Sequence, residues 1–114
     1  MQMKASEAGE ALVVSVADDR IDAAVAVRFK DLMRELTDHP AQRIVLDLSQ
    51  VEFLDSSGLG AVVGSMKQIG SGRKLDLAGL TPTVDKVFRM TRMDSVFRIY
   101  DDVGHALQDI AHAS

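Results

Sequence analysis

The sequence predicts an α/β fold in a single domain, because strand-like and helix-like segments alternate along most of its 114 residues. Apolar runs rich in Val, Ile and Leu recur, and most are followed by a segment with apolar residues at helical spacing. Gly, Pro and Asp separate these segments. Such alternation is typical of a largely parallel sheet with right-handed crossover connections. No internal repeat or linker is evident, so we expect one domain over residues 1–114.

The composition is that of a soluble globular chain, with 46% apolar and 26% charged residues. Aromatic residues are only 4% and the net charge is −4, so we expect no direct contact with nucleic acid. The absence of Cys excludes disulfides, thiolate metal sites and cysteine nucleophiles. We expect no cofactor and no metal. Without an apolar leader or a membrane-length apolar run, we also expect no membrane contact and a cytoplasmic location.

The first half of the chain is expected to hold three strands and one helix. A short edge strand over residues 1–6 leads through a turn to an almost continuously apolar strand at 11–17. Asp22 is expected to be the N-cap of an amphipathic helix at 25–36. Residues 43–48 form the best strand pattern, which we expect to be central in the sheet.

The second half of the chain is expected to add three helices and two further strands. Residues 51–54 end an apolar run, and Gly past a helix end stops the helix that follows. Thr81 and Pro82 have the pattern of an N-cap followed by proline at the first helical position. The expected elements are a helix at 57–69, a strand at 74–78, a short helix from Thr81, a strand at 96–100 and a terminal helix from Val103 to Ile110.

The most informative stretch is 53–60, Phe-Leu-Asp-Ser-Ser-Gly-Leu-Gly, where an apolar run changes into a helix. Asp55, Ser56 and Ser57 therefore lie at a predicted helix N-terminus. Backbone N–H groups there have no partner within the helix, and the local potential is positive. This environment suits a phosphate group, either bound or covalently attached.

A serine nucleophile does not fit the pattern around Ser56 and Ser57. A hydrolase elbow has Gly both two residues before and two residues after its serine, and neither serine has both. The three histidines are expected to be exposed at helix ends or in the terminal helix; they are His39, His105 and His112. We therefore expect no catalytic triad.

A nucleotide site is the second possibility, since the glycines at 58–64 resemble a dinucleotide-binding turn. The third glycine, however, stands one place late, and no phosphate-binding Gly-Lys-Ser/Thr pattern occurs. The interpretation we favour is that Gly60 and Gly64 let the helix pack closely on the sheet.

The third possibility is that one of the two serines is phosphorylated by a kinase. A hydroxyl at an exposed helix N-terminus can be reached, and its phosphate is partly accommodated by the helix dipole. Helix capping is the competing interpretation of Ser56 and Ser57. From the residues alone, capping is favoured.

The stretch Ile44–Leu48 continuing through Val51–Gly60 resembles the anti-sigma factor antagonist family, whose fold is the STAS domain. The likeness covers nearly the whole chain. Weaker support comes from residues 84–91 and from Asp22 after the second strand. Two departures stand out. Arg20 replaces an acidic residue common in relatives, and Arg92 follows Thr91 where relatives often have Gly.

The resemblance implies a mostly parallel mixed sheet of four to five strands with helices mainly on one face. It also implies a protein that is not an enzyme and that works by partner switching. The unphosphorylated form would bind an anti-sigma factor that is also a serine kinase of the GHKL type. Phosphorylation of Ser56 would abolish binding, and a PP2C-type phosphatase would restore it. The implied partner-binding residues are Asp22, Asp55, Ser56, Ser57, Gly58 and Leu59.

Two alternatives to this function stay open at this point. Some relatives with the same fold are scaffold subunits of regulatory or transport complexes and are never phosphorylated, in which case Ser56 would only cap a helix. A protein of another class, a small nucleotide-binding enzyme using the turn at Gly58, is the remaining alternative.

Overall fold

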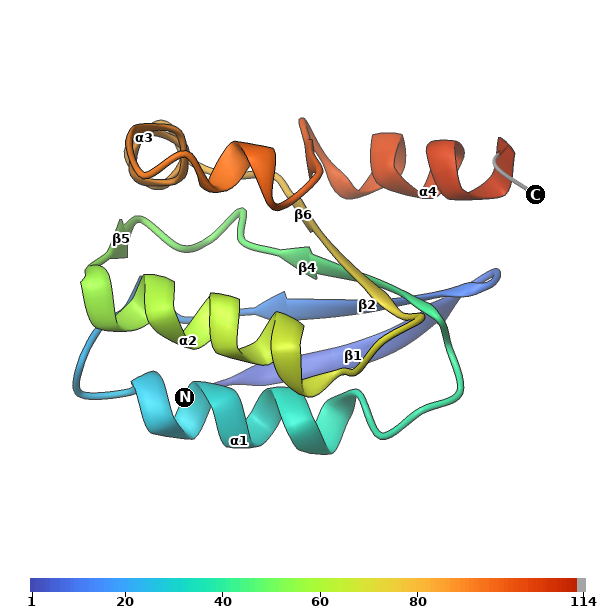
Figure 1. Cartoon of the computed structure of the whole chain (residues 1–114), viewed down its shortest axis with the longest axis horizontal. Helices are drawn as coiled ribbons and strands as arrows, with labels where there is room; N and C mark the ends of the chain where they lie inside the picture. The colour runs from blue at the N-terminus through green and yellow to red at the C-terminus, as the bar shows by residue number, and fades with distance from the viewer. Residues whose placement is uncertain (113–114) are drawn as a thin grey trace.

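A computed structural model describes residues 1–112 and contains a five-stranded mixed sheet with the strand order β1-β2-β4-β6-β7 (Figure 1). β1 is antiparallel to β2, and the other neighbours are parallel. The predicted mixed, mostly parallel sheet is confirmed, with β4 in its centre as expected. The strands are β1 (Met3–Ala8), β2 (Ala11–Val16), β4 (Arg43–Asp47), β6 (Lys74–Ala78) and β7 (Ile99–Tyr100).

A second, separate sheet consists of two short parallel strands, β3 (Arg20–Ile21) and β5 (Phe53–Leu54). β3 follows β2 in the chain and β5 follows β4, so both lie beyond the carboxyl ends of the central strands. The sequence pattern indicated neither of these as a separate strand; it showed only an apolar run that ends at residues 51–54. A two-residue strand is too short to show an apolar period of two.

Residues 1–112 contain four α-helices, which pack around the sheets, and one short 3₁₀ helix that follows α3. Figure 1 shows α1 and α2 side by side on one face, while α4 lies on the opposite side of the sheet. The first three helices contribute buried side chains to the larger core, and α4 contributes to a smaller one. The helices are α1 (Ala26–Leu36), α2 (Ser56–Gln68), α3 (Pro82–Met90), η1 (Met93–Ser95, 3₁₀) and α4 (Val103–His112).

The central strands are buried on both faces, which explains their nearly continuous apolar sequence. On β4, Ile44 and Leu46 point into the larger core, and Val45 points into the smaller core under α4. All three side chains have 0% exposure. The alternation of faces along a strand thus divides one apolar run between two cores.

Two expected helix caps differ in the structure. Asp22 does not cap α1: the helix is preceded by Val25, and the Asp22 carboxylate instead accepts a hydrogen bond from the Ala24 N–H at 3.1 Å. This local turn competes with capping, as short acidic side chains often do. Thr81 does precede α3, with Pro82 at the helix start as predicted, but its hydroxyl donates to the carbonyl of Val51 at 2.8 Å rather than accepting from the helix.

The last strand is shorter than the predicted 96–100. The N–H groups of Val96 and Phe97 both donate to the carbonyl of Met93, at 3.0 and 2.9 Å, and this turn keeps the segment out of the sheet. Only Ile99 and Tyr100 pair with β6. A turn held by i+3 and i+4 hydrogen bonds thus overrides the β-branched pattern of the sequence.

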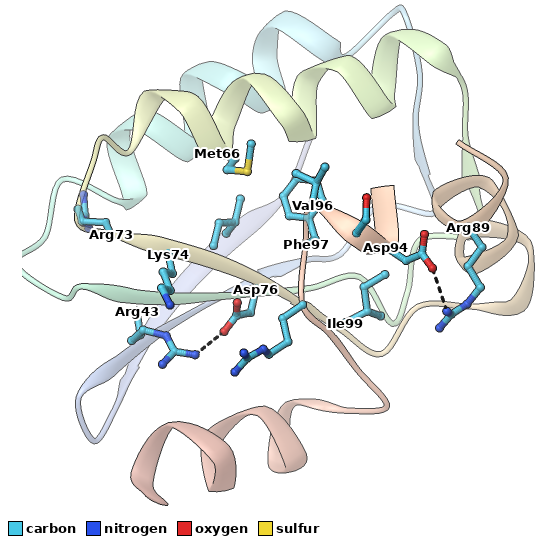
Figure 2. A pocket seen from close by; sticks show the side chains of 13 residues that line it. Arg43, Met66, Arg73, Lys74, Asp76, Arg89, Asp94, Val96, Phe97 and Ile99 are labelled. Carbon is cyan, nitrogen blue, oxygen red and sulfur yellow. Dashed lines mark hydrogen bonds and ion pairs between the residues drawn. The ribbon is translucent and has the colours of Figure 1, made fainter. Parts of the chain in front are cut away.

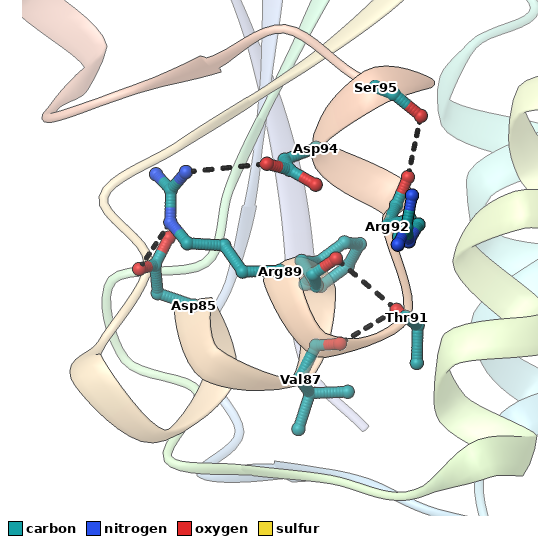
Figure 3. Close-up of polar contacts among 8 residues, drawn as sticks. Asp85, Val87, Arg89, Thr91, Arg92, Asp94 and Ser95 are labelled. Carbon is teal, nitrogen blue, oxygen red and sulfur yellow. Dashed lines mark hydrogen bonds and ion pairs between the residues drawn. The ribbon is translucent and has the colours of Figure 1, made fainter.

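Arg92 lies between α3 and η1 in the left-handed conformation, with φ 61° and ψ 24°. It is the only non-glycine residue with positive φ among residues 1–112. Figure 3 shows the surrounding turn, in which the Ser95 hydroxyl donates to the Arg92 carbonyl at 2.7 Å. Left-handed backbone costs about 1–2 kcal/mol for a residue with a Cβ atom. Glycine adopts this conformation without that cost, so it fits this position better than arginine does.

Replacing Arg92 by Gly should therefore stabilise the protein. We expect R92G to raise the free energy of unfolding by about 0.5–1 kcal/mol, because the relieved strain exceeds the entropy that Gly adds to the unfolded chain. Urea denaturation measures the change. Arg92→Ala is the control, since it removes the side chain but keeps the strain, and it should leave stability nearly unchanged. A loss of stability in R92G would contradict this account.

Candidate functional site

Asp55 organises the end of the molecule at which α2 begins. It is the N-cap of α2, and one carboxylate oxygen accepts a hydrogen bond from the Gly58 N–H at 2.8 Å. The other oxygen accepts from the N–H of Ala23, in the loop before α1, at 3.1 Å. The interpretation of the two serines as caps is therefore wrong, because Asp55 fills that role. Ser56 and Ser57 are the first residues of the helix, and both are exposed.

The same hydrogen bonds control the charge of Asp55. The Gly58 N–H is the main cause that lowers the pKa of the Asp55 carboxyl below its ordinary value of 3.8. Partial burial opposes this shift, and the N–H groups of Ala23 and Ser57 add to it. Donors that bind the ionised form favour it. At neutral pH the site therefore holds a fixed negative charge directly beside the Ser56 hydroxyl.

Gly58 is where α2 comes closest to the small sheet. A Cβ atom on Gly58 would lie 2.0 Å from the carbonyl oxygen of Ile21, so only glycine fits without a shift of the backbone. The prediction that Gly60 and Gly64 let the helix pack closely on the sheet was wrong. A Cβ on Gly60 would meet nothing within 4 Å, and one on Gly64 would contact the Lys30 side chain of α1 rather than the sheet.

Arg20 and Phe53 form a contact that the sequence analysis did not find. They are paired across the β3–β5 sheet, and the Arg20 guanidinium lies 5.0 Å from the centre of the Phe53 ring. Arg20 also pairs with Asp22 at 3.3 Å. Phe53 is 42% exposed whereas the next residue, Leu54, is buried. Because both residues are apolar, the sequence gives no signal that Phe53 faces outward.

The six residues expected to bind a partner are only partly accessible. Ser56 and Ser57 are exposed, Asp22 and Asp55 are half-buried, and Gly58 is buried. Leu59 is half-buried and packs against the larger core. The hydrogen bond from Ala23 to Asp55 brings the turn at Asp22 next to the start of α2. The other five residues, 55–59, are consecutive in the sequence. The fold brings Asp22 next to them.

The three histidines differ in exposure and in their contacts. His39 is half-buried rather than exposed as expected, since its ring contacts Glu7 at 2.7 Å and accepts from the Ala41 N–H at 3.0 Å. His105 and His112 are exposed, as predicted. Residues 1–112 contain no group of three or more His, Asp or Glu placed to hold a metal ion. No helix in the same range is both long and apolar enough to cross a bilayer.

The family model of the STAS domain matches residues 2–106. The chain belongs to the STAS domain family. An anti-sigma F factor antagonist from Paenibacillus polymyxa is 33% identical over 86 residues, which cover 70% of this chain and 74% of the relative. These matches confirm the resemblance found in the sequence.

Solved structures agree on the fold. An anti-sigma factor antagonist from Mycobacterium paratuberculosis has a TM-score of 0.86 at 24% identity, over 96% of this chain and 93% of the other. SpoIIAA in its phosphorylated form has a TM-score of 0.68 at 19% identity, over 96% of this chain and 99% of the other. At these identities the likeness is one of fold alone.

The close approach of Gly58 can be tested against a second glycine on the same helix. Gly58→Ala should destabilise the protein by about 1–3 kcal/mol, the usual effect of overpacking, because the new methyl group collides with the Ile21 carbonyl. Gly60→Ala should stabilise it by about 0.5–1 kcal/mol, since alanine favours the helix and the space is open. Urea denaturation of both variants measures the two changes. Equal effects of the two substitutions would rule out the close approach.

The charge of Asp55 can be tested by its dependence on pH. Because the folded pKa lies below the unfolded value, Asp55 contributes stability above pH 3.8 that is lost as the pH falls through the folded pKa. Asp55→Asn should therefore be less stable than the wild type at pH 7, and the difference should shrink below pH 3.8. Denaturation from pH 7 to pH 2.5 measures it, and NMR of the Asp55 carboxyl carbon reports the pKa directly. A midpoint at or above 3.8 would be inconsistent with the hydrogen bonds described.

Proposed function

We propose that this protein is an anti-sigma factor antagonist that acts by partner switching and is inactivated by phosphorylation of Ser56. Several relatives are anti-sigma factor antagonists, and the proposal assigns the same role to this chain. One observation supports the choice of Ser56. Ser56 is an exposed hydroxyl at the start of α2 that is not needed for capping, because Asp55 already caps the helix. A modification there leaves the hydrogen bonds that hold this end of the molecule in place.

The proposed docking surface surrounds Ser56. Two large apolar side chains are exposed on segments that Asp55 ties together: Phe53 at 42% on β5 and Val27 at 73% on α1. Arg20 lies over Phe53 and pairs with Asp22, and the Asp55 carboxylate binds the loop before α1. A surface of this kind, apolar patches next to fixed charges, suits contact with another protein. Ser57 and Leu59 extend it along α2, and the buried Gly58 acts through the position it gives to the helix.

Phosphorylation would switch this surface off through charge. A phosphate on Ser56 adds about −1.5 to −2 charges, which the helix N-terminus partly accommodates, so the fold persists. Beside the ionised Asp55 the same charge produces a doubly acidic patch. Such a patch repels an acidic partner surface and is costly to bury in an apolar one. A loss of about 4 kcal/mol would weaken a micromolar complex roughly a thousandfold.

In this proposal the protein is not an enzyme, and the chemistry belongs to its partners. The partner that binds the unmodified form is an anti-sigma factor that is also a serine kinase of the GHKL type. The enzyme that removes the phosphate is a phosphatase of the PP2C type. Binding of the unmodified form releases whatever the anti-sigma factor holds.

The test is mass spectrometry of the protein after incubation with ATP and a soluble extract of its host. We expect one phosphate on Ser56 in the wild type and in Ser57→Ala, and none in Ser56→Ala. Pull-down with the same extract should then show that Ser56→Ala retains a partner that Ser56→Asp binds at least tenfold more weakly.

Two results would overturn the proposal. Absence of phosphate in an extract shown to phosphorylate a related antagonist would favour a constitutive scaffold, in which Ser56 has no regulatory role. Equal affinity of Ser56→Ala and Ser56→Asp for the partner would refute the electrostatic switch.

A further inference from the structure

The side of β6 that faces β7 is hydrogen-bonded along only part of its length. On one side, β4 pairs with all five residues of β6, from Lys74 to Ala78. On the other side, β7 pairs only with Leu77 and Ala78. Within residues 1–112, no strand pairs with Lys74–Asp76 on that side, because the turn at 93–97 leads the chain away from the sheet. We refer to Lys74–Asp76 as the open edge.

The backbone of Leu75 faces this open edge. The Lys74 N–H donates to the Gln42 carbonyl on the β4 side, whereas the Leu77 N–H donates to the Arg98 carbonyl on the β7 side. Backbone directions alternate along a strand, so Leu75 points its N–H and C=O groups the same way as Leu77. An unpaired N–H and C=O at an edge form a template for a further strand.

A groove of about 630 Å³ lies along the open edge (Figure 2). It has an apolar wall on the α2 side. Arg43, Lys74 and Asp76 form a charged wall on the α4 side, and Arg89 and Asp94 lie at the end beside α3 and η1. The apolar wall is Met66, Leu75, Val96, Phe97 and Ile99. The cationic residues that line it are Arg43, Arg73, Lys74, Arg89 and Arg98, and the acidic ones are Asp76 and Asp94.

The charge of the groove is opposite to that of the whole chain. Five cations against two carboxylates leave +3 in the lining, and the two carboxylates just outside it, Asp85 and Asp109, reduce this to +1, while the chain as a whole carries −4. Three of the arginines have ion-pair partners: Arg43 with Asp76, Arg89 with Asp85 and Asp94, and Arg98 with Asp109. The cations that remain available are Arg73, which donates only to the uncharged carbonyls of His39 and Ala41, and Lys74, which has no ion pair within residues 1–112.

The ion pair of Arg43 with Asp76 satisfies this arginine only in part. Its Nη2 donates to Asp76 at 2.7 Å, but its Nε is buried and has no hydrogen-bond partner. A buried donor without a partner is uncommon in native proteins. Figure 2 shows this pair and Lys74 on the same side of the groove.

We propose that the groove binds an acidic segment of a partner protein in extended conformation, as an added strand beside β6. The bound strand pairs with Leu75 through its backbone, and its side chains alternate between the two walls. Acidic residues face Lys74 and Arg73, and apolar residues face Met66 and Phe97. This surface is distinct from the one around Ser56, since none of Asp22, Asp55 and Ser56 lines the groove.

The test is an NMR titration of the ¹⁵N-labelled protein with a heptapeptide in which Glu alternates with Val. We expect shifts at the amides of residues 73–76 and 96–98, and slower hydrogen exchange of the Leu75 amide in the complex. Affinity should fall as salt is added. A peptide of the same length in which Lys alternates with Val should cause no shifts at these amides.

Two variants separate the charge of the groove from that of the whole protein. Lys74→Glu should weaken binding of the acidic peptide about tenfold, since it places a like charge beside the bound strand. Lys4→Glu makes the same change at an exposed lysine on β1, the opposite edge strand of the sheet, and should alter affinity less than twofold. Ser56→Asp should leave binding unchanged, so this test does not depend on the proposed function.

Three outcomes would overturn the proposal. No shifts at 73–76 would mean that Lys74 only protects the edge against pairing, a common use of lysine on edge strands. Equal effects of Lys74→Glu and Lys4→Glu would show unspecific attraction. If inorganic triphosphate produces the same shifts and no peptide slows exchange at Leu75, the groove is a site for small anions.

Discussion

The carboxylate of Asp55 is the interaction on which this end of the molecule depends. It accepts hydrogen bonds from two backbone N–H groups, at Gly58 and at Ala23, and the second lies 32 residues away in the sequence. One side chain therefore both begins α2 and fixes the loop before α1. The close approach of Gly58 to Ile21 supports the same junction from the other side. Because backbone groups supply these contacts, the position of the neighbouring Ser56 does not depend on a hydrogen bond of its own side chain.

Most of the fold could be predicted from the sequence because its elements are periodic. The continuous apolar run of β4 indicates a central strand, and the spacing of Phe29 and Met33 indicates the buried side of α1. The segments that could not be predicted show no periodic pattern of apolar residues. β3 and β5 have two residues each, and the turn at Met93 is held by backbone hydrogen bonds that any sequence can make. The two short strands depend on a non-local pairing, and the turn depends on local backbone hydrogen bonds, so residue propensity decides neither.

The candidate site could also be predicted only in part. The place of Asp55, Ser56 and Ser57 at a helix start follows from residues next to them in the chain. Which of these side chains caps the helix does not, because Asp and Ser are equally good caps. The choice is made by Ala23, which only the fold brings near. In the same way, the sequence does not show that Gly58, rather than Gly60 or Gly64, is the glycine required for close packing. The reason is the Ile21 carbonyl, which only the fold brings beside it.

The division of the strands into two sheets has a consequence for how tightly any partner can bind near Ser56. The small β3–β5 sheet has too few hydrogen bonds to be stable alone. It is held by Ile21 and Leu54, which are buried in the larger core, together with the hydrogen bonds of Asp55 and the Arg20–Phe53 contact. It has fewer backbone hydrogen bonds to break than the main sheet when it opens locally. A partner that binds there must immobilise it, and the entropy lost is subtracted from the affinity. This end of the protein is thus suited to contacts that form and dissociate readily while the five-stranded sheet stays intact.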